Sequence, residues 1–268
     1  MSTASDPDRA GRKPDPIRRI RKAAKRWGKR IRFALAPGLA NRGYAICATP
    51  RSGSTYLCQL LTSTQVLGRP LEYFNTPGQR RDTDPKYPKD PRRQLEIVRS
   101  TGATRNGIYA VKLLPMHLKL IAGAIDPFRD LPNLSLVRLE RRDLLGQAIS
   151  LVRARQTRQF VATQPQDGEP VYDAQRIRDN LRSLLHQHGE WTDILTRFGA
   201  SPVVVAYEDL AAQPQRIVDR IAALMRLATP VSIDPALITH TIQRDNINAE
   251  WRRRFLDDAG DEFPGLLP

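Results

Sequence analysis

A short segment at residues 44–57, YAICATPRSGSTYL, constrains the fold more than any other part of the chain. Its apolar start predicts a buried strand, its centre is rich in turn-forming residues, and the part from Thr55 onward predicts a helix. The first N–H groups of a helix have no partner within the helix, and the helix dipole adds partial positive charge there. The segment therefore predicts a loop that binds a phosphate or a sulfate without a metal.

This loop departs from the nucleotide-binding pattern G-x-x-x-x-G-K-[ST] at two positions. Ala48 stands at the first glycine and Ser54 at the lysine. Gly53 and Thr55 match the pattern, and the cation is Arg51, inside the loop. We therefore expect an anion other than the β/γ end of a magnesium-bound triphosphate. A serine-rich turn before a core helix is the alternative that the loop alone leaves open.

The rest of the chain alternates strand-like and helix-like segments. The further strands are expected at residues 106–114, 133–143 and 201–210, and the helices at 144–160, 173–198, 214–227 and 248–255. Polar stretches rich in proline or glycine at 76–94 and 161–171 predict loops. Alternation of this kind favours a parallel sheet with helices on both faces, which is an α/β fold.

The chain has 268 residues and a formal net charge of +15, most of which lies near its start. Residues 1–43 contain 13 Lys or Arg and 3 Asp or Glu, so they carry +10 of the total. A charge of this sign favours anionic partners. We divide the chain into a basic N-terminal arm, residues 1–42, and a single domain, residues 43–268.

Within the arm, residues 16–35 predict a basic amphipathic helix. Its apolar residues recur at intervals of three and four, with Lys and Arg on the other faces. They are Ile17, Ile20, Ala24, Trp27, Ile31 and Ala34. Such a helix is typical of a membrane-surface anchor, so we expect contact with an anionic membrane. Packing on its own domain is an alternative. Binding to nucleic acid is a weaker one, because no stacking-aromatic motif interleaves the basic residues.

Cysteine content and hydropathy bear on the compartment. Cys47 and Cys58 are too few for a disulfide framework or a metal site, and they fit a reducing environment. No apolar run approaches the roughly 18 residues of a membrane span, and no secretory signal is recognisable. We therefore expect a cytoplasmic protein, held peripherally at the inner membrane face where the arm binds lipid.

Three stretches of the domain together resemble one known family. They are ATPRSGSTYL followed by GRPLEYFN, then NGIYAVKLL, then LERRDLLGQAISLVRARQTRQF; RDNINAEWRRRF is a weaker fourth. On these motifs, residues 43–256 resemble the bacterial carbohydrate sulfotransferases related to trehalose 2-sulfotransferase. The resemblance implies a P-loop-like α/β fold that uses 3′-phosphoadenosine 5′-phosphosulfate (PAPS) and no metal. It implies sulfuryl transfer to a hydroxyl of a carbohydrate or glycolipid acceptor, and we leave a homodimer open.

The resemblance also assigns the residues around the 5′-phosphosulfate of the donor. Backbone N–H groups of the loop at Gly53 and the hydroxyls of Ser52, Ser54 and Thr55 would hold it. Arg51 would offer a planar, permanently charged fork to its oxygens. Because negative charge grows on the bridging oxygen as the sulfur–oxygen bond breaks, a fixed cation there would stabilise the transition state.

A second group of basic residues matches the family's contacts to the 3′-phosphate. Arg141 and Ser150 occupy the matching positions, with Arg142 as an alternate. Nearer the C-terminus, Arg244 and the Arg252–Arg254 cluster would close over the nucleotide.

The acceptor hydroxyl needs a base to take its proton. Glu72 matches the family's catalytic glutamate, and His117 is a competing base with a more suitable free pKa. Residues 115–117 depart from the family, which has a tryptophan-containing acceptor contact there, so the identity of the acceptor stays open. Lys112 would either reach the sulfuryl oxygens or cap the end of a strand.

One rival enzyme class shares this fold. A P-loop small-molecule kinase would also carry the strand, loop and helix, but it needs a lysine where Ser54 stands. It also needs an Asp that ends an apolar strand, and none is obvious in the sequence.

Overall fold

The computed structural model describes residues 38–74, 87–160, 165–239, 246–259 and 262–263. The chain divides into two units, residues 1–33 and 34–268. The first unit lies entirely outside the described residues, and so does the amphipathic helix predicted at 16–35. All of the described residues therefore belong to the second unit.

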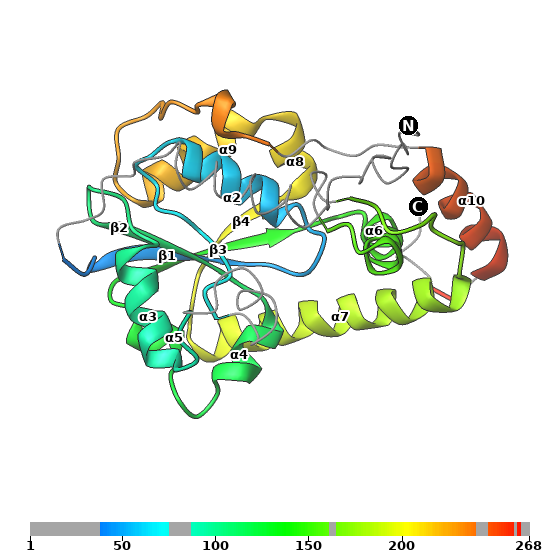
Figure 1. Ribbon diagram of the computed structural model, residues 1–268, viewed down its shortest axis with the longest axis horizontal. Coiled ribbons are helices and arrows are strands. Elements are labelled where there is room, and N and C mark those ends of the chain that lie inside the picture. The colour runs from blue at the N-terminus through cyan, green and yellow to red at the C-terminus, as the bar shows by residue number, and fades with distance from the viewer. Residues whose placement is uncertain (1–37, 75–86, 161–164, 240–245, 260–261, 264–268) are drawn as a thin grey trace, which may run out of the picture. The chain divides into compact units, whose positions relative to one another are not determined.

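A four-stranded parallel sheet forms the centre of this unit, in the order β2-β1-β3-β4 (Figure 1). Its strands are β1 (Arg42–Cys47), β2 (Ile108–Leu113), β3 (Leu134–Glu140) and β4 (Val203–Ala206). The register places Cys47 beside Leu113 of β2 and Arg138 of β3. Since all strands run the same way, their carboxyl ends meet at one edge of the sheet. The α/β fold with a parallel sheet, predicted from the alternating segments, is confirmed.

Helices cover both faces of the sheet. In the described part of the chain they are α2 (Ser54–Ser63), α3 (Pro91–Ser100), α4 (Pro115–Ile121), α5 (Pro127–Asp130), α6 (Leu144–Thr157), α7 (Ala174–Arg197), α8 (Tyr207–Ala212), α9 (Pro214–Leu224), the 3-10 helix η1 (Pro235–Leu237) and α10 (Asn246–Ala259). Figure 1 shows α2, α8 and α9 on one face and α3, α4, α5 and α7 on the other. α10 packs on α6 and α7.

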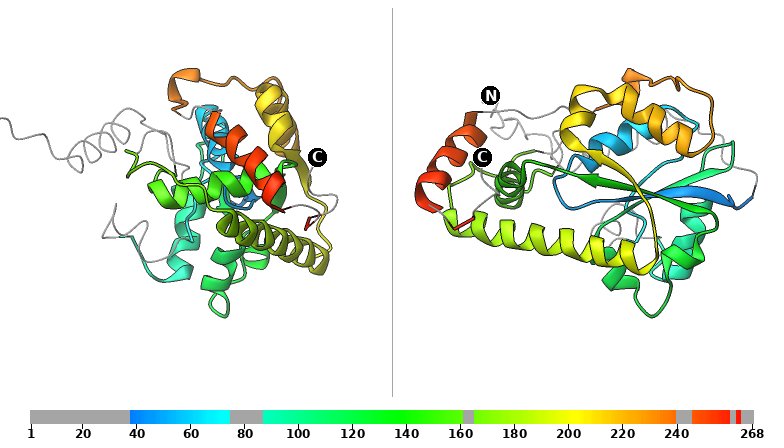
Figure 2. Two further views of the ribbon diagram at one scale, coloured as in Figure 1. Left: turned by 90° about the vertical axis from the view of Figure 1, so that its right-hand side faces the viewer. Right: turned by 180° about the vertical axis from the view of Figure 1, so that it is seen from behind.

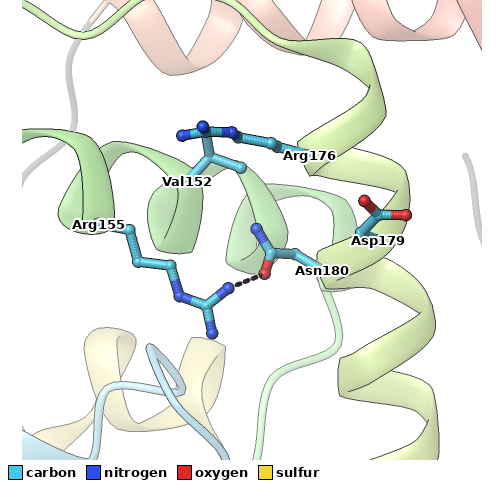
Figure 3. A pocket seen from close by; sticks show the side chains of 5 residues that line it. All are labelled: Val152, Arg155, Arg176, Asp179 and Asn180. Atoms are coloured by element: carbon cyan, nitrogen blue, oxygen red, sulfur yellow. Dashed lines mark hydrogen bonds between the residues drawn. The ribbon is translucent and has the colours of Figure 1, made fainter.

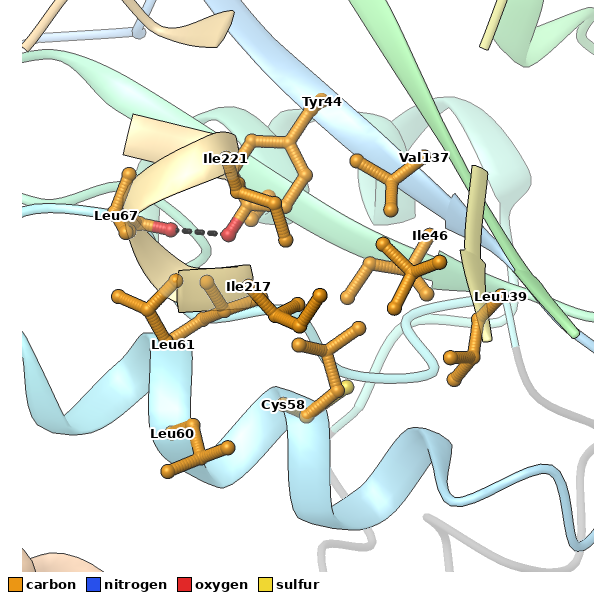
Figure 4. Close-up of a cluster of buried hydrophobic side chains, with 14 of the residues drawn as sticks. Tyr44, Ile46, Cys58, Leu60, Leu61, Leu67, Val137, Leu139, Ile217 and Ile221 are labelled. Carbon is orange, nitrogen blue, oxygen red and sulfur yellow. Dashed lines mark hydrogen bonds between the residues drawn. The ribbon is translucent and has the colours of Figure 1, made fainter. Parts of the chain in front are cut away.

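The two faces of the sheet carry separate hydrophobic clusters because successive residues of a strand point to opposite sides. Tyr44 and Ile46 of β1 belong to the cluster under α2 and α9, where the Tyr44 hydroxyl donates to the Leu67 carbonyl at 2.6 Å (Figure 4). Ala45 and Cys47 belong to the cluster on the opposite face. A near-continuous apolar run such as residues 44–48 is what a strand buried on both faces requires.

Helices α4 and α5 were not predicted from the sequence, and two predicted segments have other boundaries in the structure. Residues 76–94 were expected to form a loop, but α3 begins at Pro91. Asp90 accepts a hydrogen bond from the Arg92 N–H at 3.0 Å, so a capping residue followed by proline starts this helix. The strand expected at 201–210 ends at Ala206, and the chain turns directly into α8.

Within the described residues, no helix combines the length and the apolar character needed to cross a membrane.

The order of the strands indicates where a ligand would bind. From β1 the chain moves to β2 on one side of the sheet, and it then crosses to β3 on the other side of β1. In open parallel sheets, ligands bind outside the carboxyl ends of the strands at such a reversal. The loop that follows β1 lies at this point.

Candidate active site

The loop from Ala48 to Gly53 is anchored by three other elements. The Ala48 N–H donates to the Leu113 carbonyl of β2 at 3.0 Å, and the indole N–H of Trp191 on α7 donates to the Ala48 carbonyl at 2.9 Å. Gln147 on α6 donates through Nε2 to the Thr49 hydroxyl at 2.8 Å and to the Pro50 carbonyl at 2.6 Å. These contacts fix the loop before any ligand binds.

The sequence did not predict a role for the two side chains that hold the loop. Gln147 lies inside the motif that carries the family resemblance, and a buried amide there could have been suspected. Trp191 carries no local signal, since one tryptophan in a long amphipathic helix is expected in the core.

The loop reaches α2 through two residues with positive φ. Arg51 has φ 62°, which is uncommon for a residue with a Cβ, and Gly53 at the N-cap of α2 has φ 82°. A Cβ on Gly53 would lie 2.2 Å from the ring of Tyr207 on α8, so only glycine fits there. The N-cap makes no side-chain hydrogen bond, and the first turn of α2 contains no acidic residue. The positive end of the helix is therefore not neutralised by its own side chains.

Gly53→Ala is expected to destabilise the protein by roughly 1–3 kcal/mol, because it combines positive φ with a contact to the Tyr207 ring. Gly107→Ala is a matched control, since Gly107 has φ 77° and an added Cβ would meet nothing within 4 Å. Thermal unfolding of the two variants measures the difference. Equal melting temperatures would show that α8 yields to the added methyl group.

Arg51, Arg141 and Ser150, predicted as donor ligands, lie together. Arg51 Nε donates to Ser150 Oγ at 3.0 Å, and its Nη1 donates to the Phe160 carbonyl at 2.5 Å. Arg141 Nη1 lies 3.5 Å from the Arg51 carbonyl. Burial, followed by the charges of Arg141 and Arg153, lowers the pKa of Arg51. Among the described residues neither partner of Arg51 is a carboxylate, so the cluster suits an anion.

The other predicted donor ligands have different surroundings. The Ser52 hydroxyl donates to the Thr49 carbonyl at 2.8 Å and is fully buried, so it shapes the loop. Ser54, which is buried, begins α2, and Thr55 follows it. Arg142 is exposed and pairs with Glu208 and Asp209 of α8. Arg244 lies outside the described residues.

Glu72 lies near the carboxyl end of β2. Leu71 forms a parallel bridge with Val111, and its carbonyl accepts the Lys112 N–H at 2.9 Å. Lys112 Nζ lies 2.6 Å from Glu72 Oε1, and His117 Nε2 lies 3.6 Å from Oε2. Burial alone would raise the pKa of Glu72, but the contact with His117 and the charge of Lys112 outweigh it and lower the pKa to about 2. Lys112 therefore pairs with the carboxylate here.

The geometry of His117 bears on the choice between the two candidate bases. The Leu114 N–H donates to His117 Nδ1 at 3.2 Å, so Nδ1 carries no proton. The ring proton is then on Nε2, which faces Glu72. Nδ1 of His117 already accepts a hydrogen bond and Nε2 faces Glu72, so neither ring nitrogen is placed to take a proton. Glu72 is ionised and can accept one. This arrangement favours Glu72 as the base, with His117 holding its carboxylate.

The depressed pKa of Glu72 makes stability depend on acidity. Because the folded pKa of about 2 lies below the ordinary 4.5, this group stabilises the fold above pH 4.5, and the contribution is lost as pH falls toward 2. It amounts to on the order of 3 kcal/mol. We expect the unfolding free energy of the wild type to fall more steeply over this window than that of Glu72→Gln, as followed by urea titrations. Parallel curves would contradict the ion pair.

A cavity of about 240 Å³ lies between α6 and α7 (Figure 3). It is lined by Val152, Arg155, Arg176, Asp179 and Asn180. Arg155 donates to the Asn180 side-chain oxygen at 2.6 Å. The loop and Glu72 do not line it. Among the described residues no group of three or more His, Cys, Asp or Glu side chains could hold a metal ion.

Comparison with known proteins places this geometry in a family. Residues 43–258 match the family model described as Stf0 sulphotransferase. The chain belongs to the Stf0 sulphotransferase family. The loop, Glu72, Arg141 and Ser150 all lie inside the matched range, while the arm at 1–42 precedes it.

Relatives of this Stf0 sulphotransferase include two curated bacterial enzymes. The chain is 28% identical to trehalose 2-sulfotransferase of Mycobacterium tuberculosis (strain ATCC 35801 / TMC 107 / Erdman) over 264 residues, covering 82% of this chain and 96% of that one. It is 25% identical to trehalose 2-sulfotransferase of Mycolicibacterium smegmatis (strain ATCC 700084 / mc(2)155) over 256 residues, covering 81% and 95%. The family predicted from the motifs is therefore confirmed.

A solved structure is more distantly similar. The sulfotransferase domain from the Synechococcus PCC 7002 olefin synthase aligns with 86% of this chain and 92% of its own length, at 14% identity and a TM-score of 0.41.

Proposed function

We propose that this sulfotransferase moves the sulfuryl group of PAPS to a hydroxyl of a carbohydrate acceptor. The observation that carries the proposal is the gathering of Arg51, Arg141 and Ser150 around a loop at a helix N-terminus, with an ionised Glu72 at the end of the next strand. The relatives named for trehalose sulfation support a sugar as acceptor.

The residues present fit a donor with two anionic ends. The uncapped N-terminus of α2 and the Arg51 guanidinium suit the 5′-phosphosulfate. Arg141 suits the 3′-phosphate, since its Nε is buried without a hydrogen-bond partner among the described residues. Bound PAPS would supply an activated sulfuryl group with a bisphosphate nucleotide as leaving group. Arg51 then stabilises negative charge at the 5′ end of the nucleotide.

Glu72 takes the proton of the acceptor hydroxyl. Its carboxylate is held at both oxygens, by Lys112 and by His117, so its orientation is fixed before the acceptor binds. A pKa of about 2 makes it a weak base in this state. Movement of Lys112 toward the anionic donor would raise that pKa and strengthen the base.

Calorimetry with adenosine 3′,5′-bisphosphate (PAP) and with ATP tests the donor class. We expect micromolar or tighter binding of PAP and much weaker binding of ATP, with or without magnesium. Incubation with isotopically labelled PAPS and a sugar and glycolipid extract, followed by mass spectrometry, then identifies the acceptor. Preference for magnesium–ATP would favour the kinase alternative instead.

A glycolipid acceptor and membrane binding by the arm extend this proposal, and they rest on the sequence of residues 16–35. Each Lys or Arg near an anionic bilayer contributes about 1 kcal/mol, an attraction that salt screens. Deleting residues 1–40 is expected to abolish sedimentation with anionic vesicles at low salt while preserving turnover of a soluble sugar. Equal sedimentation of the full-length and truncated proteins would remove the membrane role.

A further inference from the structure

The C-terminal helix α10 reaches the donor site through two polar side chains. Arg252 donates through Nη2 to Asp143 Oδ1, and Asn248 accepts a hydrogen bond from Arg153 Nη1 at 2.7 Å. Figures 1 and 2 show α10 beside α6, the helix that begins just after Asp143. The buried ring of Trp251 belongs to the hydrophobic cluster shared with α6 and α7. Its packing fixes the backbone of the neighbouring Arg252.

Asp143 connects Arg252 to Arg141. Its Oδ1 accepts from Arg252 and, at 2.8 Å, from the Gly146 N–H, while its Oδ2 accepts from Arg141 Nη2 at 3.3 Å. Burial would raise the pKa of Asp143, but the Arg252 and Gly146 hydrogen bonds and the Arg141 charge lower it. The carboxylate therefore stays ionised, and each of its oxygens accepts a hydrogen bond from a different arginine.

The backbone around this carboxylate is closely packed. A Cβ on Gly146 would lie 2.0 Å from Asp143 Oδ2 and 3.0 Å from Arg141 Nη2. Glu208 of α8 accepts the N–H groups of Arg142 and Asp143, each at 3.2 Å. The turn is thus held from α8, and the side chains of Arg141, Asp143 and Arg252 are the parts left to adjust.

Arg141 keeps unused donors because Asp143 is shared. A carboxylate facing a single arginine tends to form a two-pronged pair with its guanidinium. Here Oδ1 is taken by Arg252, so Arg141 receives only Oδ2. Its Nε is buried without a hydrogen-bond partner in the described part of the chain, and its Nη1 has only a 3.5 Å contact to the Arg51 carbonyl. The guanidinium carbon of Arg141 lies 4.9 Å from the centre of the Tyr207 ring, and this stacking holds Arg141 in place.

We propose that Arg252 is a positioning residue that restrains Asp143 and so keeps Arg141 open for the 3′-phosphate of the donor. This inference rests on the proposed function, and it replaces the expectation that Arg252 itself contacts the nucleotide. Without Arg252, the Asp143 carboxylate would close on Arg141 with both oxygens and compete with the phosphate.

The test compares affinities for PAP and for AMP, which lacks the 3′-phosphate. Arg252→Gln is expected to weaken PAP binding roughly tenfold, because Arg141 would then bind Asp143 in place of the 3′-phosphate. AMP binding should be unchanged, since AMP has no 3′-phosphate. Arg197→Gln is the matched control: it removes the same charge from an exposed position in the last turn of α7. Equal PAP to AMP ratios in both variants would overturn the inference. A wild type without preference for PAP would instead contradict the proposed 3′-phosphate site.

A double-variant cycle separates positioning from direct contact. In an Asp143→Asn background, Arg252→Gln should have little further effect on PAP affinity, because no carboxylate remains to be restrained. The same tenfold loss in both backgrounds would make Arg252 a direct nucleotide ligand and overturn the inference. If Asp143→Asn does not fold, Asp143→Ser serves as the background, since serine can still cap α6 at the Gly146 N–H.

Discussion

Arg51→Ala is expected to lower kcat/KM by roughly 10²–10³-fold, with weaker PAP binding. The reason is geometric: Arg51 lies in the loop that leads into α2, and its side-chain contacts to Ser150 and to the Phe160 carbonyl orient the guanidinium without neutralising it. Arg51→Lys should recover part of the loss, because an ammonium keeps the charge but lacks the planar fork. Steady-state kinetics with PAPS and the identified acceptor measure both variants.

Two controls distinguish the loss of the Arg51 charge at the site from a general loss of charge and from a loss of stability. Arg105→Ala removes an exposed arginine from the turn before β2 and should keep wild-type kinetics. Since Arg51 already has φ 62°, alanine adds no backbone strain, and melting temperatures should stay close to that of the wild type. Wild-type kinetics in Arg51→Ala would remove Arg51 from the reaction.

Glu72→Gln is expected to slow the chemical step by roughly 10²–10⁴-fold while PAP affinity persists. Glutamine keeps the size of the side chain, and its single oxygen can still accept a hydrogen bond from Lys112 or from His117, but it cannot take the acceptor proton. Single-turnover kinetics measure the step, and calorimetry measures the affinity. Glu96→Gln, on the exposed side of α3, is the control for the loss of one carboxylate.

The same experiment compares His117 with Glu72. His117→Asn can still accept the Leu114 N–H but no longer presents the Nε2 proton to Glu72. We expect a smaller loss of kcat than in Glu72→Gln, because the base remains and only its orientation loosens. The roles are exchanged if His117→Asn loses the chemical step while Glu72→Gln keeps it.

The sequence predicted the elements whose signals are local. Residues 44–55 show a strand, a loop and a helix start because burial on both faces, turn chemistry and helix initiation each depend on neighbouring residues. The parallel sheet followed from the alternation of such elements, and the family followed from motifs around Arg51, Glu72 and Arg141. The start of α3 at Pro91 was also local, marked by Asp90 before a proline, but the surrounding polar stretch hid it.

Only the tertiary structure decided which side chains that are distant in the sequence contact each other. Lys112 and His117 both contact Glu72 because the bridge between Leu71 and Val111 sets Glu72 at the end of β2. Gln147 and Trp191 hold the loop although they lie 98 and 143 positions from their partners in the sequence. Arg252 contacts Asp143, which lies 109 positions earlier in the chain. The sequence by itself determined the residue types that can bind an anion and take a proton, since these properties belong to each side chain. Which of them pair, and so which carboxylate stays ionised and which arginine keeps free donors, depends on distances that chain folding alone establishes.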